Sequence, residues 1–563
     1  MSDIADVFVS RADIARHAGV RRPAVTNWER RHRDFPAPAP ADRADGLGEV
    51  EVFRASEVVE WLDRRTIPAN ARRSEEPAGT TYGDRFRASL GGGTRTGALL
   101  KVVQRLGGPE AERFRGELSV ADYVTVLLSL VYVRGCQPEG WKRVTAAADR
   151  YPSLLPSGEL LARILAKAVE QGLGQGHGEL FLALATKLGD LRVADTVRLL
   201  DQAGPAERTE HAQAFEWLLA RYGELGGKTA GDFFTPRAAV DIVSKLLTSE
   251  AQDVRSVHDP FVRAGELLSA ALDVVAEAQQ GPRVLEASGA GVGEHPLALA
   301  GMNLALHGLS HADLRPGHTA PSAGLVPGRP GFDRILTNPP FNARLPEYPV
   351  APGHWLYGQP PRHNANFDWL QYVVASLAPG GRAAVVMSDS AAFSSNPSER
   401  RIRAAMVEDG AVEALIALPP QLFTTTSISV TVWLLRHPRG NGDEVLFIDA
   451  RRFGTMVSRL QRALARDETE SILREYESWK AARRAGHTYP GTPGVSKAVP
   501  LAEIRERDYT LSPSVHLSSD VPTDAQSADP RELDALAGRL AEAHSRARDA
   551  DAEVDELLRR YGL

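Results

Sequence analysis

The chain has 563 residues, 43% hydrophobic and 25% charged, which is long enough for several soluble domains with sizeable cores. Its net charge of −6 excludes a protein that is basic throughout, so any contact with nucleic acid has to be local. The single cysteine, Cys136, excludes a disulfide scaffold and a cysteine-rich zinc module. No apolar run approaches the ~20 residues of a membrane span, so we expect a cytoplasmic protein without a membrane partner.

Residues 1–66 predict a helix-turn-helix or winged module. The stretch SRADIARHAGVRRPAVTNWERR gives two short amphipathic helical patterns separated by Gly19. Between residues 11 and 33 the chain has seven arginines against two acidic residues, a local charge of +5. The alternative is an arginine-rich adaptor whose charges only face solvent. We expect double-stranded DNA as the partner of this module, and the candidate contacts are Arg21, Arg22, Thr26, Asn27 and Arg30.

The next two segments carry no catalytic motif. Residues 67–83 are polar and interrupted by proline, which predicts a linker. Residues 84–226 are helical in pattern throughout, so we expect an all-α scaffold or a domain that docks partners.

Residues 227–455 change pattern, because short β-type runs alternate with helical ones. Such alternation is typical of a mostly parallel α/β sheet with binding sites at the carboxyl ends of its strands. Residues 456–563 are expected to be helical, and a leucine seam in the last helix indicates an oligomer or partner contact. The β-type runs are RSVHDPF, PRVLEASGA, FDRILTNPP, GRAAVVMSD, AVEALIALP, VTVWLLR and EVLFIDA.

The most specific motif is TNPPF, directly after the strand-like FDRIL. Pro339 and Pro340 stiffen this turn, so the side-chain oxygen of Asn338 and the carbonyl of Pro339 can converge on one planar amino group. Phe341 offers a flat apolar face on which a planar ring can stack. The pattern predicts an exocyclic nitrogen that attacks an electrophilic methyl group. The alternative is a proline-rich turn with a capping asparagine.

Two segments before this motif predict a cofactor site. In GDFFTPRAAVDIVSKLL, Thr235 is expected to cap a helix with Pro236 in its first position, and such a helix start can receive an anionic group. VHDPFVRAGELL is a strand that ends at Asp259 and continues through a loop into a helix. Nucleoside cofactors bind at such loops in doubly wound sheets.

The ordered motifs resemble those of the modification subunit of type I restriction–modification systems, which are S-adenosylmethionine-dependent adenine-N6 DNA methyltransferases. The resemblance runs from about residue 85 to 520 and implies a Rossmann-like α/β methyltransferase domain with all-α N-terminal and C-terminal regions. It also implies specificity and restriction subunits as partners, whereas the N-terminal helix-turn-helix is not part of the usual subunit. The motifs are GDFFTPR, DPFVRAGELL, MNLALHG, FDRILTNPPFN, LAPGGRAAVVMSDSAAF, ALPPQLFTTTSI and VLFIDA.

The resemblance implies roles for individual residues of this chain. Thr235, Pro236 and Arg237 would border the methionine end of S-adenosylmethionine, and Asp259 and Gly265 would shape its binding loop. The TNPPF turn would receive an adenine that has been flipped out of the duplex, because a paired base hides its amino group from any side chain.

The cofactor loop departs from the family pattern at two positions. Arg263 and Glu266 stand where the family has the first and third glycines, and only Gly265 of the three remains. A glycine there allows a close approach of the backbone and a positive φ, and a side chain resists both.

Two further positions on the cofactor side also differ. Gly291 stands where an acidic residue would hold ribose hydroxyls, with Glu286 and Glu294 as nearby substitutes. His318 replaces an aspartate that would contact the adenine of the cofactor, and a neutral histidine imitates it only in part. These departures leave open a catalytically degenerate DNA-binding regulator. A protein-glutamine methyltransferase is a third alternative, since the turn suits a carboxamide nitrogen equally well.

Overall fold

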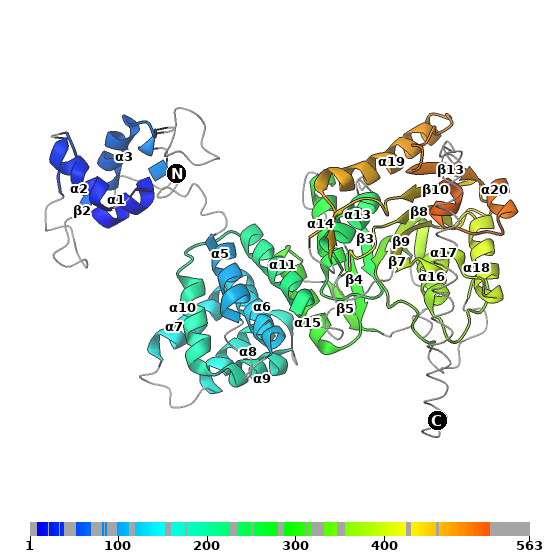
Figure 1. The fold of residues 1–563 in the computed structure, drawn as a ribbon. Helices are drawn as coiled ribbons and strands as arrows, with labels where there is room; N and C mark the ends of the chain where they lie inside the picture. The colour runs from blue at the N-terminus through cyan, green and yellow to red at the C-terminus, as the bar shows by residue number, and fades with distance from the viewer. Residues whose placement is uncertain are drawn as a thin grey trace, which may run out of the picture. The chain divides into compact units, whose positions relative to one another are not determined.

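The computed structural model describes residues 8–20, 22–32, 34–38, 52–68, 81–83, 85–86, 98–111, 119–151, 159–174, 177–225, 235–248, 253–279, 286–309, 312–317, 331–345, 355–423, 429–457 and 461–517. The chain divides into two compact units (Figure 1). The first comprises residues 1–226 and 301–310, and the second comprises 227–300 and 311–563. The leucine-rich helix expected near the C-terminus lies outside the described residues.

The N-terminal module packs three helices with a two-stranded antiparallel sheet. Gly19, with φ 66°, makes the turn between the first two helices, as the sequence predicts. Trp28 and Tyr82 pack edge to face with their ring centroids 5.4 Å apart, and Phe86 is fully buried in the same core. The segment around residues 81–86 therefore belongs to this module, where a linker had been expected to run to residue 83. The elements are β1 (Phe8–Ser10), α1 (Arg11–Ala18), α2 (Arg22–Arg31), β2 (Val52–Arg54) and α3 (Ala55–Asp63).

The described part of residues 98–225 is helical, as expected. Its central helix, α6, is buried from Tyr123 to Val133 because it is apolar on every side, and α11, α9, α8 and α7 pack around it. The elements are α5 (Ala98–Arg105), η4 (Leu106–Glu110), α6 (Val120–Cys136), α7 (Pro138–Arg150), α8 (Glu159–Leu173), α9 (Gly178–Leu188), α10 (Asp190–Asp201) and α11 (Arg208–Leu225).

The second unit is built on a nine-stranded sheet with the order β13-β10-β8-β9-β7-β6-β3-β4-β5. Strand β9 is antiparallel to β7 and β8, β13 is antiparallel to β10, and the other neighbours are parallel. The chain winds outward from β3 to β5 and then returns to β6 on the other side of β3. The strands are β3 (Ser256–Asp259), β4 (Glu286–Gly291), β5 (Asp313–Pro316), β6 (Phe332–Thr337), β7 (Leu377–Ser388), β8 (Val412–Ala417), β9 (Val430–Arg436), β10 (Glu444–Asp449) and β13 (Ser496–Pro500).

Helices cover this sheet (Figure 1). Helix α13 packs on α14 and α19, and α16 packs on β7. The core between sheet and helices holds Phe367, Trp369, Trp433 and Phe447, all fully buried. The elements are α13 (Arg237–Thr248), α14 (Glu266–Gln279), α15 (Glu294–Leu306), α16 (Asn366–Ala375), α17 (Ser390–Phe393), α18 (Pro397–Glu408), β11 (Thr455–Met456), β12 (Arg462–Ala463), α19 (Arg466–Arg484), α20 (Leu501–Glu506) and α21 (Pro513–Leu517).

The sheet continues past the boundary expected at residue 455. Strand β13 pairs with β10 from Glu444↔Pro500 to Ile448↔Ser496, so the region after 455 is not all-α as the sequence suggested. The physical reason is that β10 would otherwise be an open edge, and pairing satisfies its backbone N–H and C=O groups. Among the helices of the described residues, none is both long and apolar enough to span a bilayer.

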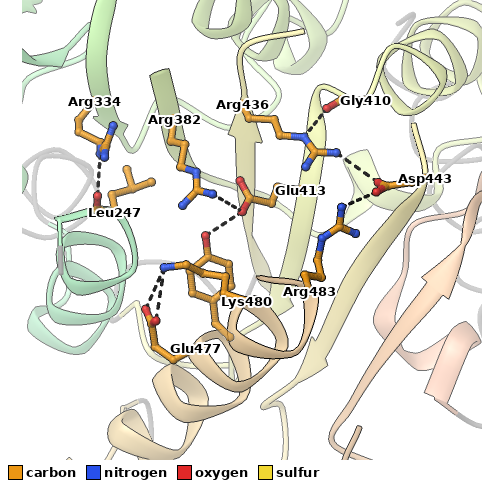
Figure 2. Close-up of polar contacts among 11 residues, drawn as sticks. Leu247, Arg334, Arg382, Gly410, Glu413, Arg436, Asp443, Glu477, Lys480 and Arg483 are labelled. Atoms are coloured by element: carbon orange, nitrogen blue, oxygen red, sulfur yellow. Dashed lines mark hydrogen bonds and ion pairs between the residues drawn. The ribbon is translucent and has the colours of Figure 1, made fainter. Parts of the chain in front are cut away.

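Buried charges gather where the parallel strands begin, at the edge opposite their carboxyl ends (Figure 2). Glu413, only 2% exposed, accepts a hydrogen bond from the Tyr476 hydroxyl (3.0 Å) and pairs with Arg382 (3.2 Å). Arg483 of α19 pairs with Asp443, just before β10. These contacts attach α19 to the sheet and lie at the edge away from the expected cofactor loop.

Candidate active site

Two adjacent strands, β3 and β6, end side by side at the point where the winding of the sheet reverses. Asp259 ends β3 and Asn338 follows β6 directly. In open α/β sheets, ligands bind beyond the carboxyl ends of the strands at such a reversal. The topology therefore brings the two most specific sequence motifs, which are 79 positions apart, to the same place.

Asp259 is buried within the turn that follows β3. Its Oδ1 accepts a hydrogen bond from the Phe261 amide at 3.0 Å, which closes the turn. Burial raises the pKa of Asp259 to about 7, and the nearby Glu266 carboxylate adds to the rise. This carboxyl thus closes the turn after β3 from inside the protein.

Asn338 lies inside the protein with one of its two polar side-chain atoms unpaired. Its Nδ2 donates to the hydroxyl of Thr235 at 3.1 Å, and both residues are buried. Its Oδ1 is also buried and has no hydrogen-bond partner among the described residues. A buried acceptor without a partner costs about 1–3 kcal/mol, so this oxygen is the site's available acceptor. Pro339 is buried, whereas Pro340 is partly exposed.

Phe341 and Asn342 anchor the end of the same turn. The Phe341 ring meets Phe423 at 71°, with centroids 6.2 Å apart. Asn342 has φ 54° and exchanges two hydrogen bonds of 2.9 Å with Asn366, at the start of α16. Sequence reasoning had not singled out Phe423 or Asn366. Phe423 lies in the ALPPQLF motif, which was a signal, but nothing local marks Asn366.

The cofactor loop retains the geometry that needs a glycine. Gly265 has φ 76°, and a Cβ there would come within 3.1 Å of the Ala300 Cα. The loop thus passes close to the neighbouring helix α15, at a position that favours glycine.

Arg263 and Glu266, the two residues of this loop that depart from the family pattern, both make hydrogen bonds. Arg263 is partly exposed, its Nε donates to the Asn338 carbonyl at 3.1 Å, and its guanidinium lies 5.3 Å from the Phe261 ring centroid. The Glu266 carboxylate is 9% exposed and accepts from the Thr235 amide (2.9 Å) and the Ala264 amide (3.1 Å). Each side chain that replaces a glycine therefore contacts another segment of the site or closes the loop.

Steric crowding explains why position 291 is a glycine. A Cβ at this position would lie 2.9 Å from the Val262 carbonyl oxygen, so an acidic side chain does not fit without a shift of the loop. Glu294 is exposed at the first position of α15, just after the carboxyl end of β4. Glu286 is the first residue of β4 and so lies at the opposite end of the strand from Gly291. This position corrects the expectation that Glu286 substitutes for the acidic residue missing at 291. His318 lies outside the described residues.

The helix after Thr235 starts one residue later than expected. Helix α13 begins at Arg237, and the Pro236 carbonyl accepts the bond from the Val240 amide at 3.0 Å, so Pro236 and not Thr235 occupies the cap position. Arg237 is exposed and pairs with Asp241 along the helix (3.0 Å). The structure thus brings Thr235 to Asn338, whereas Arg237 lies exposed at the start of α13.

In the N-terminal module, α2 carries the expected DNA contacts on its exposed side. Thr26, Asn27 and Arg30 are exposed, whereas Val25 is fully buried. Arg11 and Glu29 form a two-bond ion pair, with both distances 2.7 Å, that joins α1 to α2. Arg21 lies outside the described residues, and so does the side chain of Arg22.

Residues 207–524, more than half of the chain, match the family described as N-6 DNA Methylase. The HindI methylase subunit of a type I restriction enzyme from Haemophilus influenzae is 28% identical over 61% of this chain and 76% of its own length. The MjaIX methylase subunit from Methanocaldococcus jannaschii is 28% identical over 55% of this chain and 56% of its own length. The chain thus spans little more than half of the second relative.

A solved structure shows the same fold. The methyltransferase subunit of a type I restriction–modification system from Streptococcus thermophilus superposes with a TM-score of 0.60 at 22% identity, covering 74% of this chain and 98% of its own. The expectation of an α/β methyltransferase fold is confirmed, and a catalytically degenerate regulator is not favoured. The chain belongs to the N-6 DNA methylase family: it is a site-specific methyltransferase that uses S-adenosylmethionine to methylate adenine N6 in DNA.

Proposed function

We propose that the turn at residues 338–341 is where the methyl transfer takes place. The observation that carries the proposal is the Asn338 Oδ1 atom, buried and unpaired at the carboxyl end of β6. Leaving a buried acceptor without a partner is unfavourable, and a bound donor would complete its hydrogen bonding. An exocyclic amino group is a donor of the right kind.

The turn acts through two acceptors and one ring. Asn338 Oδ1 and the Pro339 carbonyl accept the two N–H groups of the target amine, and Phe341 stacks on the extruded base. When bound, S-adenosylmethionine supplies an electrophilic methyl group. The target amine would gain this methyl group and release one proton to water. Positioning and charge stabilisation by the two oxygens provide most of the acceleration.

The cofactor is held by residues around the loop after β3. Asp259 and Gly265 shape that loop, and the buried Thr235 with Pro236 and Arg237 borders it at the start of α13. Glu294 is positioned after β4, where a carboxylate can accept hydrogen bonds from ribose hydroxyls. His318 is the proposed contact of the cofactor's adenine ring.

We propose that the chain works as a modification subunit together with specificity and restriction subunits, in the cytoplasm where DNA is accessible. The relatives named above support this, since they are methylase subunits of type I restriction enzymes. The leucine-rich segment near the C-terminus would serve as a contact with such a subunit or a second copy. The exposed face of α2, with Thr26, Asn27 and Arg30, would provide a separate contact with duplex DNA.

Long-read modification mapping tests this function in cells. DNA from cells that carry the gene should contain N6-methyladenine at one sequence motif, and DNA from cells without it should lack the mark. DNA from cells with the Asn338→Ala variant should lack the mark. DNA from cells with Asn441→Ala, which changes an exposed asparagine before β10, should contain it. Methylated glutamine in protein, with unmodified DNA, would overturn the proposal.

A further inference from the structure

Side chains from three separate segments form a closed ring of hydrogen bonds around the 338–341 turn. Arg263 Nε donates to the Asn338 carbonyl (3.1 Å), and Asn338 Nδ2 donates to Thr235 Oγ1 (3.1 Å). The Thr235 amide donates to Glu266 Oε1 (2.9 Å), and the Ala264 amide donates to Glu266 Oε2 (3.1 Å). Since Ala264 follows Arg263 in the chain, the ring is complete.

Most of this ring is shielded from water. Thr235 is 0% exposed, Asn338 2%, Ala264 5% and Glu266 9%. Hydrogen bonds in such surroundings compete little with solvent, and those to a carboxylate or a guanidinium are stronger than neutral ones. The ring holds the Asn338 amide against the Thr235 hydroxyl, and Oδ1 has no partner among the described residues.

Both residues at positions where the family has glycine are members of this ring. A glycine at 263 could not reach the Asn338 carbonyl, and a glycine at 266 has no carboxylate to accept from the Thr235 and Ala264 amides. We propose that Arg263 and Glu266 are positioning residues, which hold in place the Asn338 backbone and the Thr235 that contacts its amide, so that Asn338 can receive the target amine. This inference rests on the proposed role of the 338–341 turn.

The opposing possibility is that Arg263 obstructs the cofactor loop. The two possibilities differ in kinetics. Loss of a positioning contact lowers kcat and leaves cofactor affinity almost unchanged, whereas removal of an obstruction raises cofactor affinity. The side chain that best separates them is methionine, which is similar in length to arginine but has no N–H donor.

Amide hydrogen exchange tests the Glu266 half of the ring without any need for activity. In the full-length Glu266→Gln variant, one carboxylate oxygen becomes an NH₂ group, which cannot accept a bond. Either the Thr235 or the Ala264 amide then loses its acceptor, so peptides that contain it should exchange at least about tenfold faster. Glu277→Gln, an exposed change on the same helix, is the matched control. Unchanged exchange in both peptides would overturn the Glu266 assignment.

Steady-state kinetics test the Arg263 half, using the full chain assembled with its specificity subunit. Arg263→Met should lower kcat about tenfold, with KM for S-adenosylmethionine within about threefold, and Arg263→Lys, which keeps a donor, should recover much of the loss. Arg255→Met, an exposed change before β3, should behave as wild type. An Arg263→Met variant that binds S-adenosylhomocysteine more tightly in calorimetry and keeps its kcat would overturn the inference. If wild type methylates no DNA, the proposed function fails, while the exchange experiment still decides whether the ring exists.

Discussion

The side-chain nitrogen of Asn338 donates to the hydroxyl of Thr235 across 103 positions of sequence. This bond holds the amide in place, and the amide oxygen has no partner among the described residues. The chemistry of the site therefore depends on a contact between the start of the helix α13 and the end of strand β6, and neither motif shows it alone.

Gly265 should tolerate no side chain. In Gly265→Ala the new Cβ would lie 3.1 Å from Ala300 Cα at a φ of 76°, so both sterics and backbone strain oppose it. We expect a loss of roughly 1–3 kcal/mol in unfolding free energy together with weaker binding of S-adenosylhomocysteine, measured by thermal unfolding and calorimetry. Gly440→Ala also changes a glycine with positive φ, but a Cβ there would meet open space. Equal cofactor affinity in the two variants would count against a role for Gly265 in the loop.

Much of the sheet could be predicted from the sequence. Each of the seven β-type runs between Arg255 and Ala450 contains a strand, because the buried strands of a parallel sheet are continuous apolar runs. Strands β5 and β13 escaped notice, since DLRP and SKAVP are short and largely polar. Their pairing depends on an open neighbouring edge, which exists only in the folded protein.

The motifs of the site could be predicted from the sequence, but the hydrogen bonds that join them could not. The 338–341 turn and Asp259 do meet at the strand ends, as the spacing of the motifs implies. The bonds of Arg263 and Glu266 were not predictable, because each joins segments that sequence separates. In the sequence alone, the only visible feature of these two positions is that glycine has been replaced.

Glu413 should matter for stability and not for chemistry. Glu413→Ala leaves Arg382 without its carboxylate and the Tyr476 hydroxyl without its acceptor (Figure 2). Loss of one partner of a buried pair costs about 3–5 kcal/mol, so urea should unfold this variant at a clearly lower concentration. Glu470→Ala, which breaks an exposed pair with Arg466 on α19, should cost well under about 1 kcal/mol. Similar midpoints for the two variants would contradict this ordering.

Asp259 should make stability depend on pH. Its pKa is about 7 in the folded chain, whereas an unfolded aspartate titrates near about 4. The folded state therefore holds one more proton between these values, so the free energy of unfolding contributed by this group falls as pH rises from about 4 to about 7. Asp259→Asn should remove that part of the slope in urea titrations at pH 5, 6 and 7. A slope identical to that of wild type and of the exposed Asp253→Asn control would contradict it.

The exposed face of α2 should bind DNA through charge. Arg30→Ala should weaken binding to duplex DNA and lower the slope of log K against log salt by about 1, the effect of one lost phosphate contact. Arg64→Ala removes an equal charge from an exposed position just after α3 and should leave the slope unchanged. Fluorescence anisotropy over a series of salt concentrations makes the comparison, and equal effects of the two variants would reduce the role of α2 to general charge.

The most direct measurement is transfer of labelled methyl groups to duplex DNA by the assembled enzyme carrying Asn338→Ala. Removal of Oδ1 takes away one of the two acceptors for the target amine, so single-turnover methylation should fall at least about a hundredfold, while the affinities for DNA and S-adenosylhomocysteine stay within about threefold of wild type. If the variant methylates adenine at the wild-type rate, Asn338 is not the acceptor and the reaction takes place elsewhere in the protein.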